Sequence, residues 1–177
     1  MSSDTTQQCF PRPPATLVDD EDRSITICHA SRQHIPAIKA MYRDFDPAQR
    51  AQGIPPANPD RLDPWVETVM DNGIHLVCEY NDRVIGHAML VPDQEGDHEL
   101  AIFIHQDFQH AGNGYALLTH LLGAGIEGDV ERVWLTVERW NRPAIELYTD
   151  VGFETVQAER FDLEMAMALS PRDEDTE

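Results

Sequence analysis

The sequence predicts an α/β (α+β) domain built on a mixed, mostly antiparallel sheet of six to seven strands flanked by about four helices. Two kinds of apolar pattern carry this prediction: short alternating or continuous apolar stretches indicate strands, and apolar residues three and four apart indicate helices. Three consecutive strand patterns joined by short polar turns indicate an antiparallel meander. The chain has 177 residues, which is enough for one domain with a hydrophobic core. The expected order is β-α-α-β-β-β-α-β-α-β-β.

The first half of the chain predicts a strand, two helices and the meander. Apolar residues recur at helical spacing between Gln33 and Phe45, and Gly73 ends a second helical stretch. Two strands of the meander meet at a tight Asn81-Asp82 turn. The expected elements are strand 24–30, helix 33–45, helix 64–73, and strands 74–80, 83–91 and 98–105.

The second half predicts a helix after Gly114, a buried strand, another helix and a closing strand. The strand over 132–138 is nearly continuously apolar, which is typical of burial on both faces. Asn141 is placed to cap the next helix, and Gly152 is a C-terminal glycine. Apolar and other residues alternate along the closing strand, 161–169. Its apolar face holds Phe161, Leu163, Met165, Met167 and Leu169.

Polar, charged segments flank this domain. Residues 1–22 are polar, contain three prolines and end in "DDED", so we expect a disordered acidic N-terminal arm. The last residues, 170–177, are expected to form a disordered acidic tail, which leaves 23–169 as the folded domain. The proline-rich stretch from 46 to 64 is long for a connector, so it reads either as a functional loop beside a site or as a plain helix-to-helix linker.

The charge is strongly negative. Thirteen Lys and Arg residues stand against 32 Asp and Glu, the formal net charge is −19, and Lys39 is the single lysine. We therefore expect no nucleic-acid partner. The acidic residues are scattered along the whole chain, which favours an origin in a halophilic organism. In molar salt, repulsion between such charges is screened within about 3 Å. A surface for a basic partner is the alternative.

Cysteines, histidines and hydropathy suggest a cytoplasmic protein. The three cysteines have no metal-binding spacing, and the eight histidines contain no helical HxxxH pair, so we expect reduced thiols and no metal. His105 is expected to be a surface histidine. No apolar run is long enough for a membrane span, and the N-terminal stretch has no apolar core of a signal peptide.

The stretch "QHAGNG", residues 109–114, places two glycines directly before a helix. Helix N-termini hold anions, and glycines let backbone N–H groups approach them. A P-loop would need a lysine after the glycine, and a dinucleotide-binding fingerprint would need a third glycine where Leu117 stands. The stretch fills the pattern Q/R-x-x-G-x-G/A at every fixed position. A simple loop with two glycines is the alternative.

Together with the element order and "WLTVERWNRPAIELYTDVGFE", this stretch resembles the GNAT superfamily of N-acetyltransferases over residues 24–169. The resemblance implies that the loop binds the pyrophosphate of acetyl-CoA, the co-substrate, and that the strand ending before it bonds the pantetheine arm through its backbone. Asn141 would touch the pantetheine, and Tyr148 would lie by the thioester sulfur. The implied cofactor-binding residues are Phe103, Ile104, His105, Gln109, His110, Ala111, Gly112, Asn113, Gly114, Tyr115 and Asn141.

Two departures from the family pattern bear on function. Many members carry Arg or Lys inside the loop, whereas His110, Ala111 and Asn113 occupy its variable places here. Affinity would then rest on backbone N–H groups and the helix dipole. Some members that acetylate protein N-termini carry a glutamate where Thr136 stands, which argues mildly against that mechanism here.

Acetyl transfer to an amine requires removal of the ammonium proton and a proton for the departing thiolate. Glu99 aligns with a glutamate that acts as general base in the histone-acetylating branch of the family; otherwise it is a solvated strand end beside Asp97. Tyr148 is the expected general acid; the alternative is that it is a tyrosine that only packs in the hydrophobic core. The backbone N–H near Ile104 could polarise the carbonyl.

The predicted function is therefore N-acetyl transfer from acetyl-CoA to a primary amine by direct attack in a ternary complex, with a non-catalytic acyl-CoA-binding or sensing module as the alternative. The acceptor is expected to be a small-molecule amine or a protein lysine or N-terminus. We expect a monomer or homodimer with no membrane partner.

Overall fold

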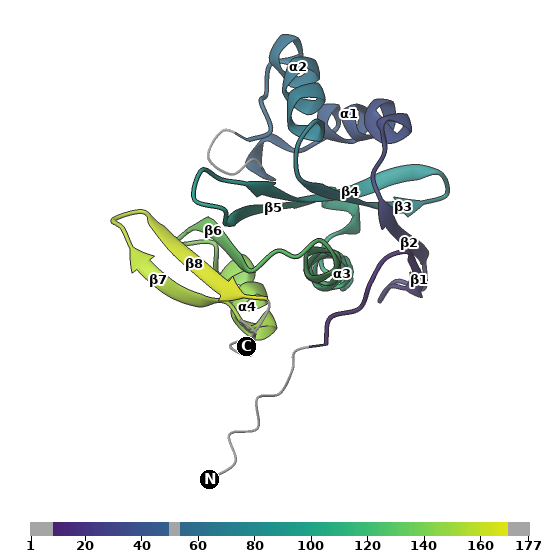
Figure 1. The fold of residues 1–177 in the computed structure, drawn as a ribbon. Coiled ribbons are helices and arrows are strands. Elements are labelled where there is room, and N and C mark those ends of the chain that lie inside the picture. The colour runs from purple at the N-terminus through teal and green to yellow at the C-terminus, as the bar shows by residue number, and fades with distance from the viewer. Residues whose placement is uncertain (1–8, 50–53, 170–177) are drawn as a thin grey trace.

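The computed structural model describes residues 9–49 and 54–169 and confirms the GNAT-type α/β architecture (Figure 1). Within those residues, eight strands form one sheet and four α-helices cover it. The strands are β1 (Ala15–Val18), β2 (Ser24–His29), β3 (Ile74–Tyr80), β4 (Arg83–Pro92), β5 (His98–Ile104), β6 (Arg132–Glu138), β7 (Glu154–Ala158) and β8 (Asp162–Ala168). The α-helices are α1 (Ile35–Arg43), α2 (Pro59–Met70), α3 (Asn113–Glu127) and α4 (Arg142–Val151).

The strands run in the order β1-β2-β3-β4-β5-β6-β8-β7. Each neighbouring pair is antiparallel except β5 and β6, which are parallel. The Asn81-Asp82 turn between β3 and β4 is confirmed, since both residues have positive φ, as a two-residue hairpin turn requires. The expected mostly antiparallel, mixed sheet is therefore correct.

Two hydrophobic cores lie on opposite faces of the sheet. Helices α1 and α2 cover one face, and α3 and α4 cover the other (Figure 1). Tyr42 of α1 packs edge-on against Phe103 of β5, with 5.7 Å between ring centroids. Leu117 and Leu121 of α3 are fully buried in the opposite core. Both faces of β3 and β4 are therefore covered by helices, which explains their nearly continuous apolar sequences, whereas β6 is buried on one face only, contrary to the expectation for 132–138.

The second helix begins earlier than expected. It starts at Pro59, because Asn58 caps it by accepting the Asp60 backbone N–H at 2.9 Å and the proline fits the first helical position. Pro64 lies inside the helix instead of opening it. Of the proline-rich stretch, residues 50–53 lie outside the described part of the chain.

The expectation of a disordered arm over residues 1–22 differs from the structure in the part that is described. Ala15–Val18 forms β1, which pairs with β2 at the sheet edge. The backbone before it crosses α3 so closely that a Cβ on Gly123 would lie 1.9 Å from the Pro11 carbonyl oxygen. Residues 1–8 and the expected tail, 170–177, lie outside the described residues.

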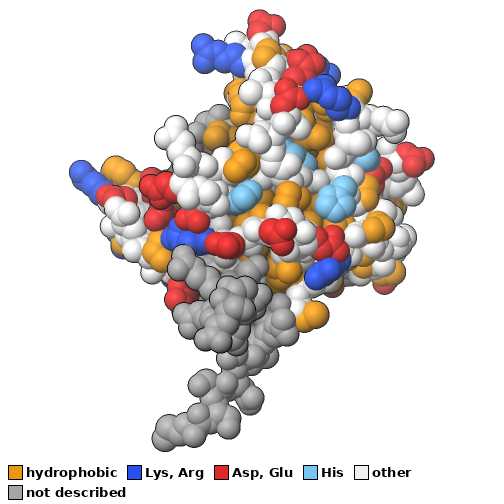
Figure 2. Space-filling view, viewed as in Figure 1, with side chains coloured by type: hydrophobic (Ala, Val, Ile, Leu, Met, Phe, Trp, Pro, Cys, Tyr) orange, Lys and Arg blue, Asp and Glu red, His pale blue; other side chains and the backbone are white. Residues whose placement is uncertain are grey.

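None of the helices in the described residues combines the length and apolar character needed to cross a membrane. Figure 2 shows acidic side chains scattered over the visible face rather than collected in a single patch.

Candidate functional site

The site forms where the two parallel strands separate. β5 and β6 pair only at His98↔Val133 and Glu99↔Trp134. The His105 N–H donates to the Ile85 carbonyl at 2.9 Å. Because backbone groups alternate in direction along an antiparallel strand, Ile102 and Ile104 turn their N–H and C=O groups away from β4, into the opening beside β6. The opening is therefore edged by strand backbone that an extended ligand can pair with.

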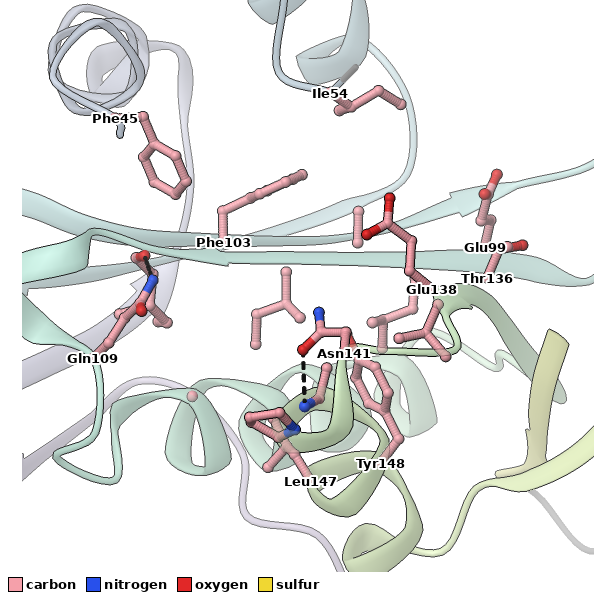
Figure 3. Close-up of a pocket in the computed structure, with 18 of the residues that line it drawn as sticks. Phe45, Ile54, Glu99, Phe103, Gln109, Thr136, Glu138, Asn141, Leu147 and Tyr148 are labelled. Atoms are coloured by element: carbon pink, nitrogen blue, oxygen red, sulfur yellow. Dashed lines mark hydrogen bonds between the residues drawn. The ribbon is translucent and has the colours of Figure 1, made fainter. Parts of the chain in front are cut away.

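A cavity of about 350 Å³ fills this opening (Figure 3). The loop before α3 lines one end of it through Gln109, His110 and Gly114. Glu99 and Thr136 lie toward the other end, and Tyr148 enters from α4. The expected phosphate loop and both expected catalytic residues therefore border one continuous space.

The N-terminus of α3 lies at one end of the cavity. Gly112 is the N-cap residue, with φ of 86°, a left-handed conformation that favours glycine. Its carbonyl accepts the Ala116 N–H at 3.1 Å, which closes the first turn and leaves the preceding N–H groups at the helix N-terminus. Such a terminus attracts phosphate through these groups and the helix dipole.

The fold itself does not require a glycine at position 114, but the open space of the cavity does. A Cβ added there would lie 3.7 Å from Leu147 and 4.0 Å from Ile104, which is ordinary van der Waals contact. The fold would accept the added carbon, yet the carbon would enter the cavity between β5 and α4. The glycine thus keeps open the place where the resemblance puts the cofactor.

Asn113 does not face the cavity, contrary to its expected role in binding the cofactor. Its side chain is 1% exposed, and its amide Nδ2 donates to the Asp19 carboxylate at 3.1 Å and to the Phe108 carbonyl at 3.0 Å. The Asp20 N–H adds a bond to the Ala111 carbonyl at 2.9 Å. The loop is therefore held from behind by the segment between β1 and β2.

The carboxylate of Asp19 is the group that holds Asn113 in this position. Burial alone would raise its pKa, but hydrogen bonds from the Arg23 backbone, the Asn113 amide, the Arg23 guanidinium and the Glu21 N–H outweigh burial and lower the pKa to about 2. The Arg23 guanidinium lies 2.8 Å from the carboxylate. Asp19 therefore stays ionised and bonded to Asn113 at neutral pH.

Other residues assigned to the cofactor have different surroundings. His105 is fully buried rather than at the surface; its Nε2 lies 2.8 Å from the Asp44 carboxylate and its Nδ1 accepts the Asp107 N–H. Ala111 is buried, whereas His110 and Tyr115 are exposed. Gln109 Nε2 donates to the Ile104 carbonyl at 3.0 Å, so it joins the loop to the end of β5.

Asn141 caps α4 and lines the cavity. Its side-chain oxygen accepts the Ala144 N–H at 3.4 Å and so caps α4, while the amide nitrogen points away from the helix toward the cavity (Figure 3). Gly152 ends that helix with φ of 124°. Both sequence expectations for the ends of this helix are confirmed.

The two expected catalytic residues have perturbed acidities. The pKa of Glu99 is raised, first by partial burial of its carboxylate and second by the charge of Asp93. Asp93 is itself held in place, because its carboxylate accepts the Trp134 indole N–H at 2.8 Å. Burial raises the pKa of Tyr148 to about 12, and its ring packs against Phe153. At neutral pH the tyrosine therefore carries a proton to donate, and the glutamate is a stronger base than usual.

Sequence reasoning missed Glu138, Phe45 and Ile54, which also line the cavity. The two-residue period of β6 was the available signal for Glu138, because Thr136 and Glu138 share a face. No local signal pointed to Phe45 or Ile54, since they reach the cavity only through the packing of the helical layer.

A further grouping outside the cavity concerns Cys28, His34 and Glu79, whose ligand atoms lie within 4.8 Å of one another. Hydrogen bonds account for it. The Ser31 N–H donates to His34 Nδ1 at 2.9 Å, so Nε2 carries the proton and donates to Glu79 at 3.2 Å. The Cys28 thiol also donates to Glu79, and its pKa is raised to about 11 by burial and by this carboxylate. Both the Nε2 nitrogen and the thiol would have to lose a proton before a metal could bind here.

Comparisons with known proteins agree with this geometry. The sequence model of the Acetyltransferase (GNAT) family matches residues 38–153. An uncharacterised N-acetyltransferase of Mycobacterium tuberculosis is 29% identical over 80 residues, which are 45% of this chain and 51% of the relative. The chain thus spans about half the length of the curated relatives it matches.

Solved structures share the fold. The GNAT domain of S. lividans PAT has a TM-score of 0.78 at 16% identity, with 88% of this chain and 97% of that chain covered. The putative acetyltransferase yncA of Salmonella typhimurium, solved with acetyl-CoA, has a TM-score of 0.67 at 21% identity, with 84% and 96% covered. The ribosomal-protein-alanine N-acetyltransferase of Brucella melitensis has a TM-score of 0.65 at 25% identity, with 81% and 99% covered. Because the family match covers more than half of the sequence, this chain belongs to the GNAT acetyltransferase family.

Proposed function

We propose that the protein transfers an acetyl group from acetyl-CoA to a primary amine by direct attack within a ternary complex. The observation that carries the proposal is the continuous cavity bordered by the N-terminus of α3, the open edge of β5, Glu99 and Tyr148. The space beside Gly114 supports the fit of acetyl-CoA. So does the solved fold neighbour from Salmonella typhimurium, which contains this cofactor.

In this proposal, different groups of the protein bind successive parts of acetyl-CoA. The first-turn N–H groups of α3 bind the pyrophosphate, and the backbone of Ile102 and Ile104 pairs with the pantetheine arm. The Asn141 amide nitrogen donates to the same arm. A backbone N–H near Ile104 polarises the thioester carbonyl and stabilises the oxyanion that forms on it.

Proton transfers complete the reaction. Glu99 accepts a proton from the ammonium, directly or through water, and the freed amine nitrogen bonds to the thioester carbon. The carbon–sulfur bond then breaks, Tyr148 gives its proton to the departing sulfur, and the second proton of the attacking nitrogen passes to the tyrosinate oxygen, directly or through water. An alkylammonium has a pKa near 10.4, so the raised pKa of Glu99 narrows the gap that this transfer must bridge.

The acceptor is a primary amine other than a protein N-terminus in this proposal. The name of the Brucella melitensis structure assigns it an alanine of a ribosomal protein as acceptor. At the place where some members of that kind carry a glutamate, this chain has Thr136, which lines the cavity with a neutral side chain.

The test separates a transferase from a module that only binds acyl-CoA. Thiol release from acetyl-CoA is measured with a panel of amines, and CoA affinity is measured by calorimetry. Glu99→Gln should lower kcat/KM by roughly 10²- to 10⁴-fold, the usual contribution of a positioned base, without changing CoA affinity. Tyr148→Phe should lower kcat with the fold intact, because only a hydroxyl is lost.

The pH profile provides an independent readout. A rising acidic limb of kcat/KM should disappear in Glu99→Gln, because that limb belongs to the Glu99 carboxyl. Near wild-type turnover in the Glu99→Gln, Tyr148→Phe double variant would contradict the proton-transfer roles. CoA binding without acetylation of any amine would instead favour the binding module.

A further inference from the structure

The acceptor end of the cavity lies on a sheet face rich in carboxylates. Glu99 and Trp134 are register partners on β5 and β6, so their side chains share one face of the sheet. Thr136 and Glu138 follow Trp134 at two-residue intervals and lie on the same face. In Figure 3 the Glu138 carboxylate lies between Phe103 and Glu99, within the cavity. A second carboxylate therefore enters the space that holds the expected base.

The next strand adds to this negative charge. Glu164 of β8 pairs with Thr136, and Asp162 pairs with Glu138, so both point to that same face. Like charges directly opposite each other on neighbouring strands destabilise a sheet. Within residues 9–49 and 54–169, no lysine or arginine forms an ion pair with Glu99, Glu138 or Glu164. The negative potential of Glu138 is therefore directed at whatever enters the cavity.

The opposite wall is apolar. Phe45 and Ile54 extend from the helical layer toward the cavity, and Phe103 completes the wall from β5 (Figure 3). Glu99 pairs with Trp134 of β6. Glu138 lies four residues farther along β6 than Trp134, which is about 13 Å of extended strand. The two glutamates thus contact different parts of a ligand, and a hydrocarbon segment that extends beyond Glu138 would lie against the aromatic wall.

We propose that the acceptor is an aliphatic diamine or polyamine: its reacting amine lies at Glu99 and its distal ammonium pairs with Glu138, while any longer hydrocarbon chain continues past Glu138 toward Phe103 and Phe45. This inference rests on the proposed transferase function. Glu138 is the specificity-determining residue, because its charge is favourable for a second ammonium and unfavourable for a carboxylate at the same place. A simple alkylamine would lack the ion pair, and an amine with a distal carboxylate would be repelled.

Three acceptors of matched length test the inference. Cadaverine, pentylamine and aminocaproate differ in carrying a distal ammonium, a methyl group or a carboxylate. At one salt concentration, kcat/KM should fall in that order, and the ratio of cadaverine to pentylamine should be about tenfold or more, the size of one favourable charged contact. Glu138→Gln should reduce this ratio about tenfold, and Glu138→Lys should favour aminocaproate over cadaverine.

Glu146→Gln is the matched control, because Glu146 is an exposed residue of α4 that does not line the cavity. This variant should keep the wild-type ratio. Equal use of pentylamine and cadaverine by the wild type, or an equal loss for all three amines in Glu138→Gln, would overturn the inference.

Binding measured without turnover separates this inference from the proposed function. Calorimetry of cadaverine with the CoA-loaded protein should show binding that weakens in Glu138→Gln and persists in Glu146→Gln. If no amine is acetylated while this pattern of binding holds, the transferase proposal fails and the diamine site stands. If acetylation of amines is observed but cadaverine shows no dependence on Glu138, the diamine site fails and the transferase proposal stands.

Discussion

Acid should destabilise this protein through a histidine buried between the sheet and α1. His87 of β4 is fully buried; its Nδ1 lies 2.6 Å from the Tyr42 hydroxyl and its Nε2 lies 3.0 Å from His75 Nδ1. His75 Nε2 in turn donates to the Asn72 carbonyl at 2.7 Å. Each neutral imidazole thereby donates one hydrogen bond and accepts one, so the chain of bonds is complete without an added proton.

Burial, with a smaller contribution from His75, lowers the pKa of His87 from 6.5 to about 3. The unfolded chain therefore binds a proton between pH 6.5 and 3 that the folded protein does not, and the stability from this group is present above pH 6.5 and lost as the pH falls toward 3. One bound proton corresponds to about 1.4 kcal/mol per pH unit, so lowering the pH from 8 to 5 should remove about 2 kcal/mol of unfolding free energy.

The assay is urea unfolding at several pH values from 8 to 5, above the range in which most carboxyls titrate. His87→Gln removes the titrating group and keeps one donor and one acceptor, so its unfolding free energy should fall by about 2 kcal/mol less than that of the wild type over this range. The exposed His29→Gln is the matched control and should behave as the wild type. Parallel pH dependences of the wild type and His87→Gln would refute the reasoning.

Three other expectations follow from the site and the charge. Gly114→Val should leave the circular dichroism spectrum unchanged and abolish CoA binding in calorimetry, because its methyl groups occupy the space between Ile104 and Leu147, while Gly114→Ala should bind with intermediate affinity. Asp19→Asn should raise the Kd for CoA roughly tenfold, the equivalent of one hydrogen bond to a charged group, because an amide in place of the carboxylate no longer holds Asn113; an unchanged Kd in the folded variant would contradict the supporting role. With a net charge of −19, the unfolding temperature should rise steeply from low to molar KCl, and a flat dependence would favour a basic partner as the reason for the acidic surface.

Several parts of the site could be read from local sequence. The spacing of the two glycines before a helix pointed to the loop over 109–114, and the structure places Gln109, His110 and Gly114 at one end of the cavity. Glu99 and Tyr148 were also expected and border that space. The loop prediction depended on a pattern within a few residues, where backbone conformation follows directly from the chain, whereas the roles of Glu99 and Tyr148 came from the resemblance to the GNAT superfamily.

Other features depended on partners distant in the chain. β1 is only four residues long and forms because the edge of β2 is available, so its own pattern was too short to distinguish it from an arm. Asn113 turned inward because Asp19, 94 positions earlier in the chain, offers a carboxylate behind the loop. His105 is buried against the rings of Phe45 and Phe108, and Asp44 of the helical layer forms a hydrogen bond with its Nε2.

By itself, the sequence determined the order of the helices and strands after β1 and the position of the glycine loop before α3, and its resemblance to the GNAT superfamily named Glu99 and Tyr148 as the expected catalytic residues. Only the tertiary structure decided that β5 and β6 separate after two paired residues, and that Glu138 and Phe45 line the same cavity. The physical reason is that hydrophobic periodicity reports which face of an element is buried, whereas the shape of a cavity depends on how far apart neighbouring elements lie.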